Sequence, residues 1–158
     1  IVIAQLLYDP LLTADVRYTR PYYNAGLVLV SPARQPLESM NALPGYSLAY
    51  EYGSQADAEA RRWLRRILPF DQRPYELPVY ALDAVRMGAA DAALVDATSA
   101  RLYLRDHADW QAVMQPVTDE LDVIAARINR VAMWARIDSA LEALTSSGTL
   151  DRIIAMWL

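Results

Sequence analysis

The sequence predicts an α/β fold, and three observations carry this prediction. Short apolar runs typical of buried strands alternate with segments in which apolar residues recur at helical spacing. Hydrophobic residues make up 54% of the 158-residue chain and charged residues 22%, a composition typical of a globular domain. A chain of this length buries roughly two thirds of the surface that its unfolded form exposes, which suffices for a core. Because strands alternate with helices, we predict a largely parallel sheet.

The first third of the chain supplies strands and one connector. Apolar runs predict three buried strands: Ile1–Leu7, Gly26–Val30 and Ser47–Tyr50. Ser31 and Pro32 close the second of these strands. The segment Thr19–Tyr23 contains proline and two tyrosines and predicts a turn-like connector.

A helix signal follows the third strand. Ser54 can accept a hydrogen bond from the Asp57 amide while the Asp57 carboxylate reaches back, in the manner of a capping box. Apolar residues then recur on one face of the predicted helix: Ala60, Trp63, Leu64, Ile67 and Leu68.

The remaining sequence continues the alternation. Pro78 begins a helix over Val79–Met87, and Gly88 suits its left-handed C-terminal cap. The later elements are a strand over Asp91–Val95 ending at Asp96, a helix over Thr98–Arg105, strands near Ala112–Val117 and Val123–Arg127, a helix lined by Trp134, Ile137, Leu141 and Leu144 that stops at Gly148, and a terminal helix over Leu150–Leu158.

The composition excludes several chemistries. The chain has no cysteine, which excludes disulfides, thiolate zinc sites and cysteine nucleophiles. All 15 basic residues are arginine, so Schiff-base and phosphate-loop lysines are excluded too. With His107 as the single histidine, neither a triad nor a multi-histidine metal site is expected from one copy. A net charge of −4 argues against a nucleic-acid partner, and no apolar stretch is long enough to span a bilayer.

The segment Tyr50–Gln55 is the first candidate site. It combines a strand, the glycine Gly53 and the capping residue Ser54 at a helix start. First-turn amides at a helix N-terminus suit a carboxylate or phosphate, and Gly53 lets a ligand approach the backbone closely. A strand-to-helix turn with a good cap is the alternative reading.

Asp96 is the second candidate. An acidic residue at the carboxyl end of a parallel strand lies where open α/β sheets bind their ligands. Its carboxylate can hold an ammonium or guanidinium group, which complements an anion site at Gly53. The alternative is that Asp96 only caps the following helix at Thr98 and Ser99.

Two further groups allow a structural and a functional reading. The cluster Arg61, Arg62, Arg65 and Arg66 is typical of a solvated helix face, with an anionic partner surface as the alternative. Seven tyrosines are either half-buried packing residues or walls of a small-molecule cleft: Tyr22, Tyr23, Tyr46, Tyr50, Tyr52, Tyr75 and Tyr80. No pair of carboxylates is spaced for acid–base catalysis.

Four segments stand in order along the chain: Thr19–Val30, Leu43–Ser54, Tyr80–Asp96 and Ile137–Trp157. They look like a Ser-x-Pro-Tyr segment, a second-lobe opening with a ligand-binding helix start, a stretch that ends in an ammonium-binding aspartate, and a closing helix with a tryptophan. In this order they resemble the bilobal extracellular or periplasmic solute-binding proteins of amino-acid ABC importers. Together these segments span nearly the whole chain.

The resemblance implies a type 2 periplasmic-binding-protein fold. One complete three-layer α/β lobe would span residues 26–118. A first-lobe strand and connector (1–25) would precede it, and a return hinge with the C-terminal helices of the first lobe (119–158) would follow it. The lobes would close about hinge strands near Tyr23–Leu27 and Leu121–Ala125. The family begins with elements that this sequence does not contain, so an N-terminal extension and a signal peptide in the precursor are expected.

The implied function is a periplasmic or extracellular receptor, without cofactor or catalysis. It would bind an amino acid or a related amine-bearing solute between its lobes and dock on a membrane permease. The ligand-binding residues implied are Tyr52, Gly53, Ser54, Gln55, Asp96 and Gln5.

The sequence departs from the family at its carboxylate clamp. Leu7 and Leu12 fall where the family has threonine and arginine, and Gln55 stands where threonine is usual. Arg17 or Arg20 could substitute only if the loop runs differently. These departures imply a ligand that is less anionic or bound differently.

Other functions are consistent with the same segments. The main alternative is the ligand-binding sensor domain of a membrane signalling receptor, and a dehydratase-like enzyme ranks behind it. An interaction module would depend on the arginine cluster. Completion of the cleft by a second copy, through self-association, is a further expectation.

Overall fold

A computed structural model describes Leu6 and residues 9–158. The strand predicted over Ile1–Leu7 therefore lies almost wholly outside the described residues. The Leu6 carbonyl accepts a hydrogen bond from the Val123 amide at 2.9 Å. The chain divides into two compact units, which are residues 1–25 with 120–158 (unit 1) and residues 26–119 (unit 2).

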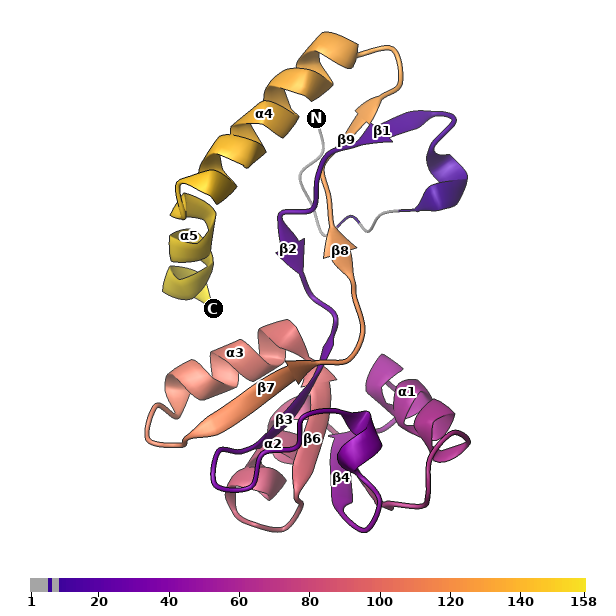
Figure 1. Cartoon of the computed structure of the whole chain (residues 1–158), viewed down its shortest axis with the longest axis vertical. Helices are drawn as coiled ribbons and strands as arrows, with labels where there is room; N and C mark the ends of the chain where they lie inside the picture. Colours follow the sequence, from indigo (N-terminus) through magenta and orange to yellow (C-terminus); the bar gives the residue numbers. More distant parts are fainter. Residues whose placement is uncertain (1–5, 7–8) are drawn as a thin grey trace. The chain divides into compact units, whose positions relative to one another are not determined.

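Unit 2 is built on one sheet with the strand order β5-β4-β6-β3-β7 (Figure 1). Its strands are β3 (Leu27–Pro32), β4 (Ser47–Glu51), β5 (Asp71–Tyr75), β6 (Ala92–Asp96) and β7 (Ala112–Pro116). β4 pairs in parallel with β5 and β6, whereas β3 pairs antiparallel with both β6 and β7. The prediction of a largely parallel sheet is thus wrong for half of the pairings, because β3 runs opposite to the other strands.

The direction of β3 follows from its place at the start of the unit. The chain enters unit 2 through β3 and leaves it through β7, and these strands are antiparallel neighbours. The amides of Val117 and Thr118 both donate to the Leu27 carbonyl, at 2.8 and 3.2 Å. The two ends of the unit are therefore held together at one edge of the sheet.

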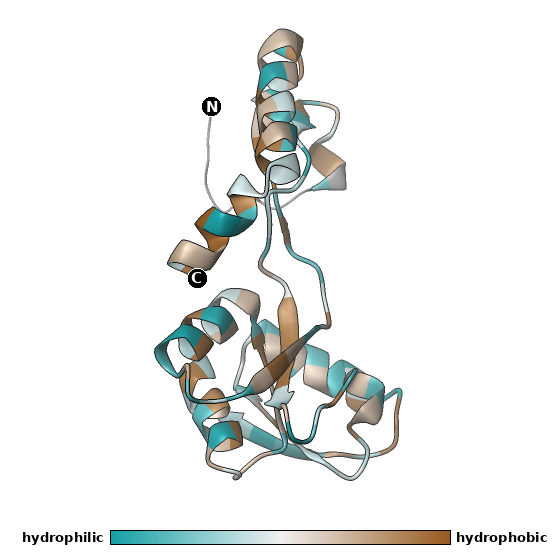
Figure 2. Ribbon diagram, turned by 60° about the vertical axis from the view of Figure 1, so that its left-hand side comes forward, coloured by the Kyte–Doolittle hydropathy of each residue, from teal (hydrophilic) through white to brown (hydrophobic). Residues whose placement is uncertain are grey.

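Helices cover both faces of this sheet, so unit 2 has three layers (Figures 1 and 2). α2 (Pro78–Arg86) and α3 (Ala97–Asp106) pack on one face, while α1 (Gln55–Leu64) and the short η2 (Met40–Ala42) pack on the other. Val28 and Val30 enter the first core, and Leu27 and Leu29 enter the second. A strand buried on both faces needs an unbroken apolar run, which is what β3 has.

Several elements of unit 2 differ from their sequence predictions. β5 was not predicted, because Asp71–Tyr75 has no apolar alternation; it is an exposed edge strand that pairs with β4 through the backbone. β3 continues through Ser31 and Pro32 instead of closing there. The α1 helix ends at Leu64, so Ile67 and Leu68 lie beyond it, and Leu68 is exposed.

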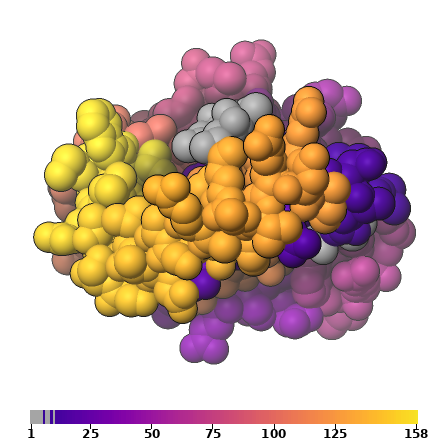
Figure 3. Space-filling view, turned by 90° about the horizontal axis from the view of Figure 1, so that it is seen from above, coloured from indigo at the N-terminus to yellow at the C-terminus, as the bar shows by residue number. Residues whose placement is uncertain are grey.

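Unit 1 consists of short ladders and two helices. β1 (Val16–Tyr18) pairs antiparallel with β9 (Ala125–Arg127), and β2 (Tyr23–Asn24) pairs antiparallel with β8 (Leu121–Asp122). A turn of helix, η1 (Pro10–Leu12), precedes β1. α4 (Val131–Ser146) and α5 (Thr149–Trp157) follow β9 and are separated at Gly148, as predicted; Figure 3 shows this unit's helices in yellow and orange.

An ion pair ties α4 to the connector before β2. Asp138 accepts hydrogen bonds from the Arg20 amide at 2.8 Å and from its guanidinium at 3.0 Å. These bonds hold the pKa of Asp138 below its usual value. Among the described helices, none combines the length and apolar character that crossing a membrane requires.

Candidate functional site

Strand order places the two candidate segments at one edge of unit 2. β4 and β6 are parallel neighbours, with Tyr50 opposite Leu94. Tyr52 and Asp96 each lie two residues beyond that pair, and adjacent strands lie about 4.8 Å apart. The sheet therefore brings the turn after β4 and the end of β6 to the same carboxyl edge.

The turn after β4 depends on Gly53 and Ser54. Gly53 has φ +74°, a left-handed conformation that L-residues rarely adopt. Ser54 caps α1, because its Oγ accepts from the amides of Ala56 and Asp57 at 3.1 and 3.4 Å. The same hydroxyl donates to the Glu51 carbonyl at 2.7 Å. The Ser54 side chain is thus fully used in shaping the turn.

Asp57 completes the predicted capping box and accepts the hydrogen bond of the Gly53 amide, which was expected to bind the ligand. Its carboxylate accepts from the Gly53 amide at 2.9 Å and binds the Arg61 guanidinium at 2.6 and 3.0 Å. Arg61 holds the pKa of Asp57 below its usual value, so the carboxylate is charged and neutralised locally. The Ser54 amide is engaged as well, with the Glu51 carbonyl at 3.4 Å.

One first-turn amide is left for a ligand. Gln55 is exposed at the first position of α1, and its N–H makes no hydrogen bond to any residue that the structure describes. The positive end of a helix dipole adds to such a donor. An anion at this turn would therefore meet the Gln55 amide rather than that of Gly53.

The structure confirms the capping reading of Asp96, and the binding reading stays a prediction. Asp96 is the N-cap of α3, with Oδ1 accepting from the Ser99 amide at 2.8 Å. The half-buried carboxylate still has Oδ2, which makes no hydrogen bond within the described ranges. The cap holds the side chain in place and leaves one oxygen for a cation.

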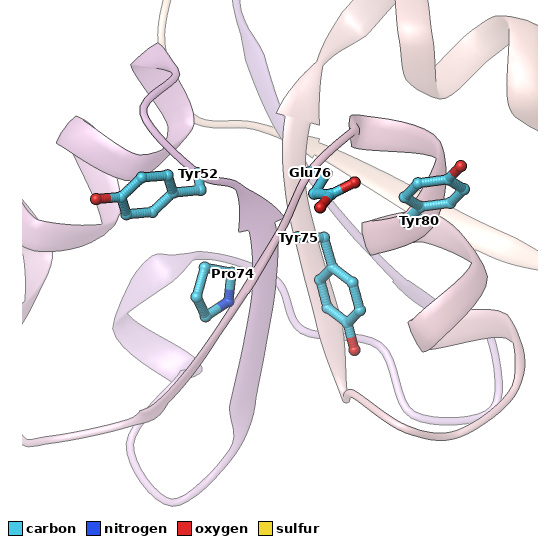
Figure 4. Close-up of a pocket in the computed structure, with 5 residues that line it drawn as sticks. All are labelled: Tyr52, Pro74, Tyr75, Glu76 and Tyr80. Atoms are coloured by element: carbon cyan, nitrogen blue, oxygen red, sulfur yellow. The ribbon is translucent and has the colours of Figure 1, made fainter.

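A pocket of about 750 Å³ lies at the same edge of the sheet (Figure 4). It is lined by Tyr52, Pro74, Tyr75, Glu76 and Tyr80. The three tyrosines are among the candidate cleft walls identified from the sequence, whereas Glu76 was not predicted. An acidic residue directly after a strand would have indicated it, but the strand β5 was not predicted either.

The expected residues of unit 1 do not form a carboxylate clamp in the part that is described. Gln5 and Leu7 lie outside the described residues, and Leu12 is 47% exposed in η1. Arg20 binds Asp138 and Glu142, and the Arg17 guanidinium lies 5.4 Å from the centre of the Trp134 ring. Both arginines thus have partners inside unit 1.

Two arginines of the predicted cluster and the single histidine contact side chains on their own helices. Arg61 and Arg62 pair with acidic residues one turn earlier on α1, as expected for a solvated helix face. The ring of His107 stacks on Tyr103 at 4.1 Å. Within the described part of the chain, no three His, Cys, Asp or Glu side chains are grouped to hold a metal ion.

Comparison with solved structures identifies the fold. The chain is similar to the L-cystine solute receptor of Neisseria gonorrhoeae in its unliganded open conformation (TM-score 0.78, 19% identity, 97% of this chain and 64% of that one). It is similar to an ancestral cationic amino acid solute-binding protein (TM-score 0.68, 23%, 97% and 66%) and to an ancestral cyclohexadienyl dehydratase (TM-score 0.70, 17%, 97% and 65%). No protein-family model and no curated protein sequence matches the chain.

The chain therefore has a periplasmic-binding-protein-like fold, as the sequence resemblance implied. It spans about two thirds of the length of these solved structures. The same fold occurs in binding proteins and in a dehydratase, so the fold alone does not distinguish binding from catalysis, and a function has to be inferred from the site.

Proposed function

We propose that this protein is the solute-binding receptor of an ABC importer and that it binds an amino acid or a related amine-bearing solute. One observation carries the proposal. At the carboxyl edge of β4 and β6, a carboxylate oxygen of Asp96 and the N–H of Gln55 are both left without a protein partner in the described part of the chain. An ammonium and a carboxylate on one small molecule fit this pair of groups.

The local structure supports each half of the recognition. The Ser99 amide fixes the Asp96 carboxylate, so that Oδ2 can accept from an ammonium without losing the cap. The Gln55 N–H lies at the start of α1, where the helix dipole favours a carboxylate. Because Arg61 neutralises Asp57, the buried negative charge beside this amide does not repel the ligand strongly.

The named relatives support the same class of ligand. One is an L-cystine receptor and another is a cationic amino acid binding protein. By analogy, the bound solute would be enclosed when a second lobe closes, in the periplasm or outside the cell, and the loaded protein would dock on a permease. Binding and release involve no chemical step in this proposal, so recovered solute should be unchanged.

Calorimetric titration of the protein in its full natural length, with the common L-amino acids and simple amines, tests the proposal. Asp96→Asn is the informative variant, since asparagine caps helices as well as aspartate but carries no charge. We expect it to lower affinity about tenfold or more, the usual loss for a hydrogen bond to a charged group. Asp109→Asn, an exposed carboxylate after α3, is the matched control. Equal binding by wild type and Asp96→Asn would refute the site.

A further inference from the structure

The pocket beside the candidate site extends the proposed function, on which this inference rests. It contains three tyrosines, one proline and one charged residue, Glu76. Asp96 and Gln55 do not line it, but Tyr52, in the same turn as Gly53, does. Its volume of about 750 Å³ has room for the side chain of a ligand whose ammonium and carboxylate bind at Asp96 and Gln55.

Three separate elements hold the walls of the pocket. Tyr52 comes from the turn after β4, and its amide donates to the Tyr75 carbonyl at 2.8 Å, which ties this turn to the end of β5. Glu76 follows β5 directly, and Tyr80 lies in the first turn of α2, which begins at Pro78. Figure 4 shows Glu76 between Tyr52 and Tyr80, with the Tyr75 ring pointing away from its carboxylate.

The charge of the pocket is set by Glu76. Its carboxylate is exposed and makes no ion pair or hydrogen bond with the residues that the structure describes. The nearby guanidinium groups are engaged elsewhere, because Arg61 binds Asp57 and Arg73 binds Asp71 and the Ala89 carbonyl. No protein cation in this part of the chain competes with a ligand for Glu76.

Aromatic walls reinforce this preference. The faces of tyrosine rings carry partial negative charge and attract cations, and guanidinium groups are the cations most often found over them. Tyr52 and Tyr80 are 68% and 47% exposed, so both rings have surface to offer an apolar stem. A carboxylate between two exposed rings suits a positively charged group on a flexible aliphatic chain.

We propose that the pocket binds the cationic side chain of a basic amino acid, with Glu76 as its counter-ion and Tyr52 and Tyr80 as its walls. The ligand then carries two positive groups. Its α-ammonium binds Asp96, and its guanidinium or terminal ammonium binds Glu76.

Arginine and citrulline test this assignment, because they have nearly the same shape and differ in side-chain charge. Calorimetry on the full-length protein should show tighter binding of arginine. Glu76→Gln should lower arginine affinity about fivefold, the size of one partly solvated charge pair, and leave citrulline unchanged. Glu38→Gln, an exposed carboxylate between β3 and η2, is the matched control and should change neither affinity.

A second pair of variants tests the aromatic wall. Tyr80→Phe should keep arginine affinity within about twofold, since the ring face remains, whereas Tyr80→Leu should lower it several-fold. Circular dichroism spectra and urea midpoints matching those of wild type establish that each variant is folded.

The outcomes separate this inference from the proposed function. If citrulline binds as tightly as arginine, if Glu76→Gln lowers both affinities equally, or if arginine does not bind, the pocket assignment is overturned. If citrulline binds as tightly as arginine, or if Glu76→Gln lowers both affinities equally, the proposed function is still supported when Asp96→Asn abolishes binding of both arginine and citrulline. An effect of Glu76→Gln without any effect of Asp96→Asn would overturn the proposed function and retain the pocket.

Discussion

Replacing Gly53 by alanine tests how the candidate site is shaped. An added β-carbon would meet no atom within 4 Å, so the substitution introduces no clash. The cost is the left-handed backbone at φ +74°, which for an L-residue amounts to about 1–2 kcal/mol. Alanine also restricts the unfolded chain, which offsets some of this cost. We expect a net loss of about 1 kcal/mol in the free energy of unfolding.

Gly88→Ala is a matched control for this prediction. Gly88 has φ +77° and equally open surroundings, but it follows α2 at the other end of the sheet. Urea unfolding at 25 °C should give similar losses for both variants, and Gly53→Asn should lose less because asparagine tolerates this conformation. Ligand affinity should fall only for Gly53→Ala, whose turn positions the Gln55 amide. Unchanged or increased stability of Gly53→Ala would refute the reasoning.

Three other variants test the core and two ion-pair clusters. Leu94→Ala, at a fully buried position of β6, should cost about 3 kcal/mol in urea unfolding, and a cost below about 1 kcal/mol would mean that the sheet core is packed differently. Arg20 lowers the pKa of Asp138, so the stabilisation is present above the unfolded pKa near 3.9 and is lost as the pH falls through the folded pKa. The stability difference between wild type and Asp138→Asn should therefore shrink in acid; a constant difference contradicts this. Burial and a hydrogen bond to Asp83 raise the pKa of Tyr103 to about 12, so ultraviolet titration should show a tyrosine ionising near pH 12 that Tyr103→Phe removes.

Local sequence signals predicted the helices well because caps and glycines act over a few residues. Ser54 caps α1 and Gly88 is left-handed after α2, as predicted, and α4 stops before Gly148, also as predicted. The α1 helix nevertheless ends at Leu64, although the apolar spacing continues through Ile67 and Leu68. Periodicity therefore located the buried face but not the end of the helix.

Strand direction and the polar edge strand depend on partners that lie far away in the chain. β5 has four exposed residues and forms because β4 offers its backbone, so its own sequence carries little signal. The reversal of β3 is a property of its pairing with β6 and β7 and leaves no mark in its composition.

The same difference explains what was foreseen at the candidate site. Asp96 and Ser54 were identified because each stands at a strand end or helix start that the sequence reveals. Glu76 follows the strand that was missed. The hydrogen bond from the Gly53 amide to Asp57 could not be predicted, because it depends on which backbone amide the short aspartate side chain reaches.

The pairing of β3 with β7 makes unit 2 a self-contained insertion. Both connections to the rest of the chain leave from neighbouring strand ends, fastened by the two hydrogen bonds to the Leu27 carbonyl. A loop of a few residues could join residues 26 and 119, so a circularised or permuted form of this unit should fold without stretching its sheet.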